Sequence, residues 1–359
     1  MNIFDEIDYY DQLFDLGVRN IDIPRRFLRD AQDPYAMDVH NFKYRYRFSQ
    51  DTVKHFILPL IVTDLIKYNK RGMPIAPEIQ ILVCLRFYAT ASFQIVAGDL
   101  LHVSQPAVSN IVSKISQLLA QKHSQFIKYS SDMTSNRLEF RRLGQYLQYH
   151  GLPNINGAID CTHIKIVNTP GVQHHEVFRN RKSYFSINVQ AVVGPTGKFM
   201  DVVARWAGST HDSRIFQLSN LNNKYIQRIH DGKLIGDSGY PCLPYLMTPV
   251  TSPSNTAEEV YNKVHVKTRI IVERAFGIWK RRFPCLSRGL GNKLSTVSNI
   301  IVACAVLHNI ANSTSDDAPV EDDEALSLQA DSSQDSQNNY GGTAEGFAIR
   351  QTLINSYLQ

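Results

Sequence analysis

Hydrophobic residues recur with a helical period through the first 150 residues and with a strand-like pattern after residue 155. The period predicts helices over 51–68 and 77–90. It predicts a further helix that begins after Ser104, a good N-cap residue, with Pro106 in its first turn. One face of that helix is apolar, and a short helix over 93–101 precedes it. The two helices and the turn at His102 form a helix-turn-helix pattern.

The polar residues near the start of the second helix of this pattern can bind DNA. Gln105, Ser109, Asn110, Ser113 and Lys114 point away from its apolar face, and each can donate a hydrogen bond to a base or a phosphate. Small polar residues also suit any exposed helix face, so both interpretations stay open. The basic-aromatic run over 42–48 is ambiguous in the same way, because it can bind nucleic acid or form a half-buried edge.

Residues 151–312 have strand-like runs of apolar residues in place of the helical period. Strands are predicted over 155–168, 182–194, 198–208 and 234–240, with a hairpin turn at Pro195-Thr196-Gly197. A helix is predicted over 213–219, between the third and fourth strands. The fourth strand is followed by a proline-rich loop over 241–257, a helix over 261–282 and a buried helix over 295–312. The organisation is therefore a helical region (1–150), an α/β domain (151–312), an acidic disordered tail (313–345) and a short terminal helix (346–359).

Charge divides the chain unequally. Residues 313–359 hold nine acids and one basic residue, Arg350, a net −8, which leaves +13 on residues 1–312. A basic body with an acidic tail favours nucleic acid as a partner. No membrane span and no secretory signal are expected. The five cysteines are widely spaced with no CxxC pair, which favours a reducing compartment and argues against a zinc site.

The helix over 261–282 carries one acid among seven basic residues. Glu273 lies off the apolar face formed by Val272, Ala275, Phe276 and Trp279. Taken alone, Glu273 is explained by an ion pair with Arg269 one turn away. The basic residues predicted to hold a DNA backbone are Lys267, Arg269, Arg274, Lys280, Arg281 and Arg282.

Three acids lie at positions that the order of elements brings together. Three strands, a helix, a fourth strand and a helix follow the order of the ribonuclease-H-like fold, in which the first strand is central. Asp160 lies in the first strand, Asp237 ends the fourth and Glu273 projects from the helix. Asp212 adds an acid after the third strand, although it could instead cap the next helix. Clustered carboxylates repel unless a cation holds them, and hard oxygen ligands favour Mg²⁺ or Mn²⁺. Two such ions can activate a water and stabilise the leaving oxygen of a phosphodiester.

Several ordered blocks resemble the DDE endonuclease domain of PIF/Harbinger transposases and their domesticated nuclease-like relatives. The blocks are AIDCTHIKI, NRKSYFSINVQAVVG, GSTHDSRIF, GDSGYPCLPYLMTP, YNKVHVKTRIIVERAFGIWKRRFPCL and VACAVLHNI. The resemblance covers about residues 155–312. It implies that Asp160, Asp237 and Glu273 form the catalytic triad, with Asp212 as a further metal ligand. It also implies a separate Myb/SANT-like partner that assists DNA binding and nuclear entry.

The leading hypothesis is a metal-dependent DNA endonuclease or transposase in the nucleus. The cytoplasm as a second location and a homo-oligomer are alternatives that the sequence leaves open. The alternative is a catalytically silent domesticated transposase that binds DNA or a partner protein. An intact set of acids favours the enzyme.

Overall fold

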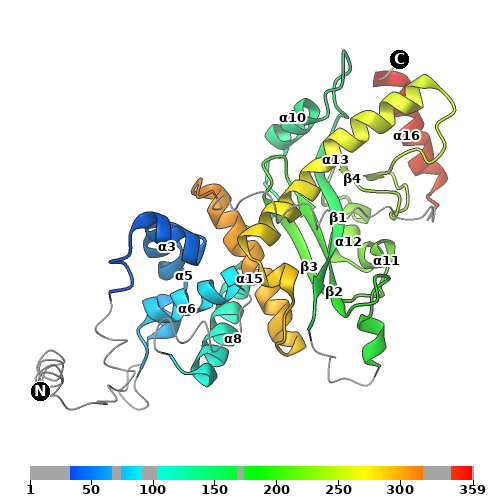
Figure 1. Cartoon of the computed structure of the whole chain (residues 1–359). Helices are drawn as coiled ribbons and strands as arrows, with labels where there is room; N and C mark the ends of the chain where they lie inside the picture. Colours follow the sequence, from blue (N-terminus) through cyan, green and yellow to red (C-terminus); the bar gives the residue numbers. More distant parts are fainter. Residues whose placement is uncertain (1–32, 67–73, 91–102, 168–173, 318–340, 358–359) are drawn as a thin grey trace, which may run out of the picture.

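The computed structural model describes residues 33–66, 74–90, 103–167, 174–317 and 341–357 (Figure 1). Its first part is helical, as the hydrophobic period predicted. The helices are α3 (Val39–Tyr46), α4 (Gln50–Thr52), η1 (Val53–Ile57), α5 (Leu58–Leu65), α6 (Pro77–Thr90), α8 (Gln105–Gln121), α9 (His123–Phe126) and α10 (Thr134–Leu143). The helix predicted over 77–90 is confirmed. The one predicted over 51–68 is confirmed as the continuous run α4–η1–α5, whose central turn is a π-helix. Its last two predicted residues lie outside the described ranges.

The helix-turn-helix prediction is only half covered by the described residues. Helix α8 begins as expected, with Ser104 in the N-cap position and proline in the first turn, although the Ser104 side chain makes no capping hydrogen bond. The apolar face of α8 packs against α6 and α15 (Leu294–Ser313). The short helix predicted over 93–101 lies outside the described residues, so the complete motif stays a prediction.

The basic-aromatic run over 42–48 belongs to the core. Phe42, Tyr46 and Phe48 are buried, and Arg47 is 7% exposed. Lys43 forms an ion pair with Asp316 at 2.8 Å. Tyr44 is 54% exposed, but the other three aromatic rings are not free to stack on bases, so the interpretation as a half-buried edge is confirmed for this run.

A mixed five-stranded sheet forms the centre of the second part, in the order β3-β2-β1-β4-β5. The strands are β1 (Ile155–Lys165), β2 (Ser186–Val193), β3 (Phe199–Ala207), β4 (Lys233–Ile235) and β5 (Leu246–Met247). The first three pair antiparallel, and β4 runs parallel to both β1 and β5. This order confirms that β1 is central and neighbours β4. Strand β5 was not predicted, because only two residues of the proline-rich loop pair with β4.

Helices cover both faces of the sheet, as in an α/β fold. On one face lie α13 (Thr256–Arg282) and α15, which pack on β1 and β3 respectively. On the other face lie α11 (Asp212–Gln217) and α12 (Asn220–Ile226), whose Phe216, Leu221 and Tyr225 pack with Ile159 of β1. Because both faces are covered, every residue of β2 is buried, including the polar residues Ser186, Asn188 and Gln190.

The sequence pattern missed several short or polar elements. These are α3, α9, α10, η2 (His175–Phe178), α12, β5 and α14 (Cys285–Arg288). Helix α10 is strongly polar, yet it packs on β1 and α13, with Phe140 as its buried residue. Such elements depend on tertiary contacts and not on a strong local pattern.

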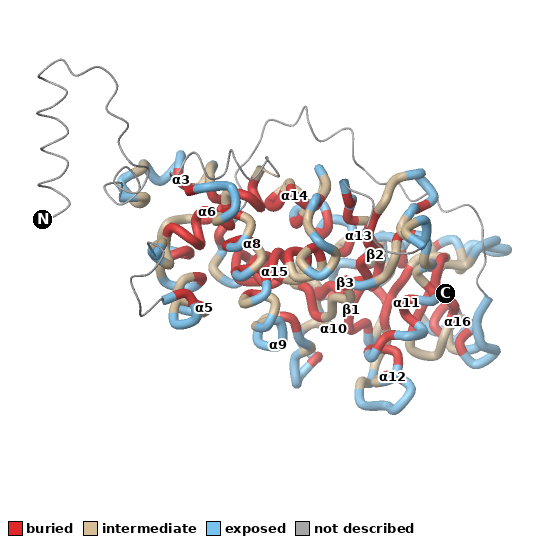
Figure 2. The backbone as a smooth tube through the Cα atoms, turned by 90° about the horizontal axis from the view of Figure 1, so that it is seen from below, coloured by how far each residue is buried: buried red, intermediate tan, exposed pale blue. Residues whose placement is uncertain are grey.

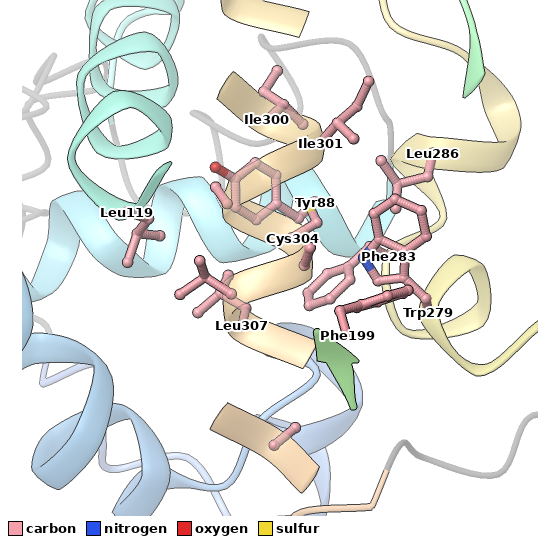
Figure 3. Packing of buried hydrophobic residues seen from close by; sticks show 14 of the residues in the cluster. Tyr88, Leu119, Phe199, Trp279, Phe283, Leu286, Ile300, Ile301, Cys304 and Leu307 are labelled. Carbon is pink, nitrogen blue, oxygen red and sulfur yellow. The ribbon is translucent and has the colours of Figure 1, made fainter. Parts of the chain in front are cut away.

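One hydrophobic core joins the helical region to the sheet. The cluster runs from Phe42 and Tyr88 through α15 to Phe199 and Trp279. Figure 2 shows this buried backbone passing from α6 and α8 through α15 to the strands. Figure 3 shows Leu119 on one side of α15 and Phe199 with Trp279 on the other, with Tyr88 drawn across α15. The boundary at residue 150 stays a prediction, and it does not separate two cores.

Helix α15 is long and apolar enough to cross a membrane by length and composition. However, 72% of its most apolar window is buried inside the protein. It packs against α8 and β3, and this burial in the core explains why the helix is so hydrophobic.

Both ends of the tail predicted as disordered are ordered. Asp316 is 5% exposed, and one of its carboxylate oxygens accepts a hydrogen bond from the Ser49 amide at 2.8 Å. Gly342 pairs with Cys242 as an isolated bridge. The prediction was therefore wrong at these two ends, where tertiary contacts hold polar residues. Residues 318–340 lie outside the described ranges. The predicted terminal helix is confirmed as α16 (Ala344–Tyr357), which packs on α13 and β5.

Candidate active site

The strand register brings Asp160 and Asp237 to the same level of the sheet. The parallel pairing of β1 with β4 ends at Ala158 and Ile235. Asp160 lies two residues beyond the first of these, and Asp237 lies two residues beyond the second. At this point β4 has ended and the chain turns, with the Gly239 amide donating to Asp237 Oδ1 at 3.0 Å. The two carboxylates therefore lie at the point where β1 continues beyond the end of β4.

Asp160 is buried, and both of its oxygens are engaged. Only 7% of the residue is exposed. The Cys161 amide donates to Asp160 Oδ1 at 2.7 Å, and Arg269 Nη1 donates to Oδ2 at 2.8 Å. Burial raises the pKa of Asp160 well above its ordinary value, and the charges of Asp237 and Asp212 add to the shift, while Arg269 opposes it.

Asp212 approaches the group from the start of α11. It is the first residue of that helix, and His211 takes the N-cap position. The Asn188 side-chain amide donates to Asp212 Oδ1 at 2.9 Å and to the Thr210 carbonyl at 2.9 Å. The role of helix cap that the sequence left open for Asp212 is therefore not the one observed. Its carboxylate is held by β2.

Tyr240 is buried beside Cys161, near enough to the three aspartates for their charges to act on its hydroxyl. It is 1% exposed, and its hydroxyl lies 3.3 Å from Cys161 Sγ. Burial raises the pKa of the Tyr240 hydroxyl, and the neighbouring Cys161, Asp212, Asp160 and Asp237 raise it further. Sequence reasoning missed Tyr240 and Asn188. Two signals in the sequence could have found them. Tyr240 ends the GDSGY block, and Asn188 is a polar residue inside the buried strand β2.

Glu273 joins this group through Arg269. The two residues lie one turn apart on α13, and Arg269 Nη2 donates to Glu273 Oε1. The predicted ion pair is confirmed, and the same guanidinium bonds Asp160. Glu273 therefore lies on the same side of the sheet as Asp160, with its side chain 49% exposed.

The four carboxylates suit a hard divalent cation by donor type. However, among the residues that the structure describes, no three acids, histidines or cysteines are close enough together to hold a metal ion. Arg269 lies between Asp160 and Glu273 and forms an ion pair with each of them. All five cysteines are free, and the imidazole of His163 contacts Ser186 Oγ at 3.1 Å.

The predicted DNA-binding residues fall into two groups on two helices. On α8, Gln105, Asn110 and Lys114 are exposed and Ser109 is partly exposed. On α13, Lys267 and Arg274 are exposed, while Lys280 and Arg281 are partly exposed. Lys267 Nζ donates to the Gln145 carbonyl at 3.0 Å, and Lys280 Nζ donates to the His163 carbonyl at 3.3 Å.

Two predicted DNA-binding residues on α13 have other contacts. Arg282 is 2% exposed; its Nη1 donates to the Arg47 carbonyl at 2.7 Å, and its Nη2 donates to the Asp316 carbonyl. Assigning Arg282 to DNA was wrong, because its guanidinium is enclosed by carbonyl oxygens and the Phe48 ring. Arg269 is 16% exposed at its side chain, and its observed partners are the two acids.

Comparisons with known proteins identify the family of this chain. Residues 159–309 match the model of the DDE superfamily endonuclease family. The chain is 33% identical over 306 residues to the human protein named "Putative nuclease HARBI1", covering 83% of each chain. It is 29% identical over 303 residues to the protein of the same name from Xenopus laevis, again over 83% of each.

A plant protein is also similar to most of the chain. The protein named "Protein ALP1-like" from Arabidopsis thaliana is 26% identical over 322 residues, which are 82% of this chain and 76% of the relative. No solved structure was found to match. The endonuclease-family match spans Asp160, Asp237 and Glu273, and the HARBI1 match extends over most of the chain. The chain belongs to the PIF/Harbinger family of DDE transposases and transposase-derived, nuclease-like proteins.

Proposed function

We propose that this protein is a DNA endonuclease, a transposase or a nuclease derived from one, with a ribonuclease-H-like catalytic domain. The observation that carries the proposal is that Asp160 bonds the Arg269 guanidinium that also bonds Glu273, while Asp212 and Asp237 lie near enough for their charges to raise the pKa of Asp160. Asp160 comes from a strand, Asp237 from the turn after β4, and Asp212 and Glu273 from two helices; such convergence at one edge of a sheet is typical of a catalytic site.

Asp160, Asp237 and Glu273 would hold Mg²⁺ or Mn²⁺, with Asp212 as a further ligand. The bound cation would supply an activated water and charge stabilisation at the leaving oxygen of a phosphodiester. Asp160 is fixed in a central strand and Asp237 in a bonded turn, so both oxygen donors are positioned before substrate binds. Asn188 would orient Asp212 by its hydrogen bond.

The DNA backbone would lie over the exposed basic residues of α13. Lys267, Arg274 and Arg281 lie on the same helix as Glu273, so a phosphate that contacts them is near the acids. The start of α8 would read bases as the second helix of a helix-turn-helix. Action on DNA implies a nuclear location, and a Myb/SANT-like partner would assist binding.

A second candidate is a catalytically silent DNA-binding protein. It is favoured by the observation that Arg269 already forms ion pairs with Asp160 and Glu273, and that the described residues contain no preformed group of three metal donors. Both candidates predict DNA binding, and only the first predicts cleavage.

Nicking of supercoiled plasmid DNA with Mg²⁺ or Mn²⁺ distinguishes them. We expect cleavage by the wild type, and its loss in Asp160→Asn and Glu273→Gln, because each removes ligand charge at nearly constant volume. Asp231→Asn is the matched control, because Asp231 is exposed and pairs only with Arg137 among the ion pairs described. Cleavage that persists equally in all four proteins would indicate a contaminant. Its absence from a folded, DNA-binding wild type would favour the silent candidate.

A further inference from the structure

Arg269 holds the centre of the candidate site. Its Nη1 lies 2.8 Å from Asp160 Oδ2, and its Nη2 donates to Glu273 Oε1. Its side chain is only 16% exposed, so it reaches from α13 toward the sheet. The fork of a guanidinium can bond two carboxylates at once, which an ammonium group does less well.

The negative charges around Arg269 explain why a positive side chain lies among these acids. Three aspartates and Glu273 would otherwise repel one another in a partly buried place. Burial disfavours the charged guanidinium, but the charges of Asp160, Glu273 and Asp237 outweigh it and raise the pKa of Arg269. Arg269 therefore stays positive and supplies the countercharge that this group of acids requires.

A divalent cation would need the same carboxylate oxygens. Asp160 Oδ1 is already bonded by the Cys161 amide, so Oδ2 is the better-placed donor for a cation, and Arg269 occupies it. A cation bonded to Asp160 and Glu273 would also be close to a fixed positive charge. In a site of low dielectric, such like charges repel strongly.

We propose that Arg269 is a charge clamp of the metal-free state, which holds Asp160 to Glu273 and has to release both before a divalent cation binds between them. This inference rests on the proposed metal-dependent function. The released guanidinium needs another anion, and a DNA phosphate over α13 provides one. Cation and DNA therefore bind cooperatively, because each removes an obstacle to the other. Arg269 is a positioning residue in this scheme.

Mn²⁺ binding measured by calorimetry, with free Mn²⁺ followed by electron paramagnetic resonance, tests the clamp. Arg269→Gln should bind Mn²⁺ on the order of ten-fold more tightly than wild type without DNA. Arg274→Gln is the matched control, because it removes the same charge from an exposed position on the same helix. It should change the affinity much less. Arg269→Lys keeps the charge but loses the fork, so it should lie between wild type and Arg269→Gln.

Two further measurements separate the clamp from a simple change of net charge. Without metal, Arg269→Gln should unfold at a lower temperature than Arg274→Gln, and Mn²⁺ should remove the difference. A short duplex should tighten Mn²⁺ binding to wild type, and this coupling should fall to near unity in Arg269→Gln.

Equal or weaker Mn²⁺ binding by Arg269→Gln, relative to Arg274→Gln, would overturn the clamp. Should Arg269→Gln not fold, Arg269→Lys carries the comparison by the same criterion. A wild type that binds Mn²⁺ but does not nick DNA, together with tighter binding by Arg269→Gln, would sustain the clamp and reject the nuclease. If no protein binds Mn²⁺, with or without DNA, both the clamp and metal-dependent cleavage are rejected.

Discussion

Asn309 and Phe199 are joined by two hydrogen bonds that tie α15 to the beginning of β3. The Phe199 amide donates to Asn309 Oδ1 at 2.8 Å, and Asn309 Nδ2 donates to the Phe199 carbonyl at 2.7 Å. Asn309 Nδ2 also donates to the Phe126 carbonyl at 2.9 Å. One buried amide therefore connects the helical region, α15 and the sheet.

We predict that Asn309→Ala lowers the free energy of unfolding by about 2–4 kcal/mol, because it leaves buried backbone groups without partners. Urea unfolding monitored by circular dichroism measures this. Asn223→Ala on α12 is the control, because Asn223 is exposed, and it should shift the midpoint little. Equal midpoints for the two variants would mean that the Asn309 hydrogen bonds contribute nothing measurable.

The stability of this protein should depend on pH through His308. Its Nε2 lies 2.9 Å from the Gly197 carbonyl. Burial, aided by the charge of Arg282, lowers its pKa to about 4. Between that value and about 6.5, the unfolded chain binds a proton that the folded chain excludes. His308 therefore favours unfolding progressively as the pH falls from about 6.5 to 4.

His308→Gln removes this contribution, although it loses packing at every pH. From pH 7 to pH 5 we expect the wild type to lose about 2 kcal/mol more than His308→Gln. Urea titrations at several pH values measure the difference, with the exposed His55→Gln as control. Parallel pH profiles of wild type and His308→Gln would show that His308 is not kept neutral in the fold.

Arg282 should act on stability and Arg274 on DNA affinity. Arg282→Met leaves the Arg47 and Asp316 carbonyls without their buried donor, so we expect a loss of about 2–4 kcal/mol. Thermal unfolding measures this loss. Arg274→Ala should unfold close to wild type and bind DNA more weakly. A stable Arg282→Met variant with reduced DNA affinity would restore the original DNA-binding assignment.

The basic face of α13 should set the salt dependence of DNA binding. Replacing Lys267, Arg274 and Arg281 by alanine should weaken binding to every sequence. It should also lower the slope of log affinity against log salt by about 0.9 for each DNA phosphate that the variant no longer neutralises. Fluorescence anisotropy at several salt concentrations measures both effects. Arg228→Ala, an exposed charge after α12 on the opposite face of the sheet, is the control. An unchanged slope in the triple variant would place the DNA elsewhere.

Base recognition should depend on the start of α8. Replacing Ser109 and Asn110 by alanine should reduce the preference for one sequence more than the overall affinity, since neither residue carries charge. Selection from a random duplex library, compared between wild type and the variant, measures this preference. If the preference survives intact, α8 is a packing helix, consistent with its position against α6 and α15.

The sequence by itself determined the elements with strong periods and the identity of the acids. Helix α6, strand β1 and helix α13 lie close to their predicted ranges. The pattern of apolar residues reflects where each element is buried, in a helix against its neighbours and in a strand between two layers of helices. The order of strands and helices also placed Asp160, Asp237 and Glu273 toward one edge, since short connections restrict the topologies of a sheet.

The Arg269–Glu273 pair follows from the helix period, and only the tertiary structure decided which partners the charges find in other elements. Arg269 and Arg282 look alike in a basic helix, yet one bonds two acids and the other bonds two buried carbonyls. Asp316 looked like part of a disordered tail, and it is held by Lys43 and Ser49. Local sequence does not encode such partners, because the energy of a charge depends on burial and on neighbours that are distant along the chain.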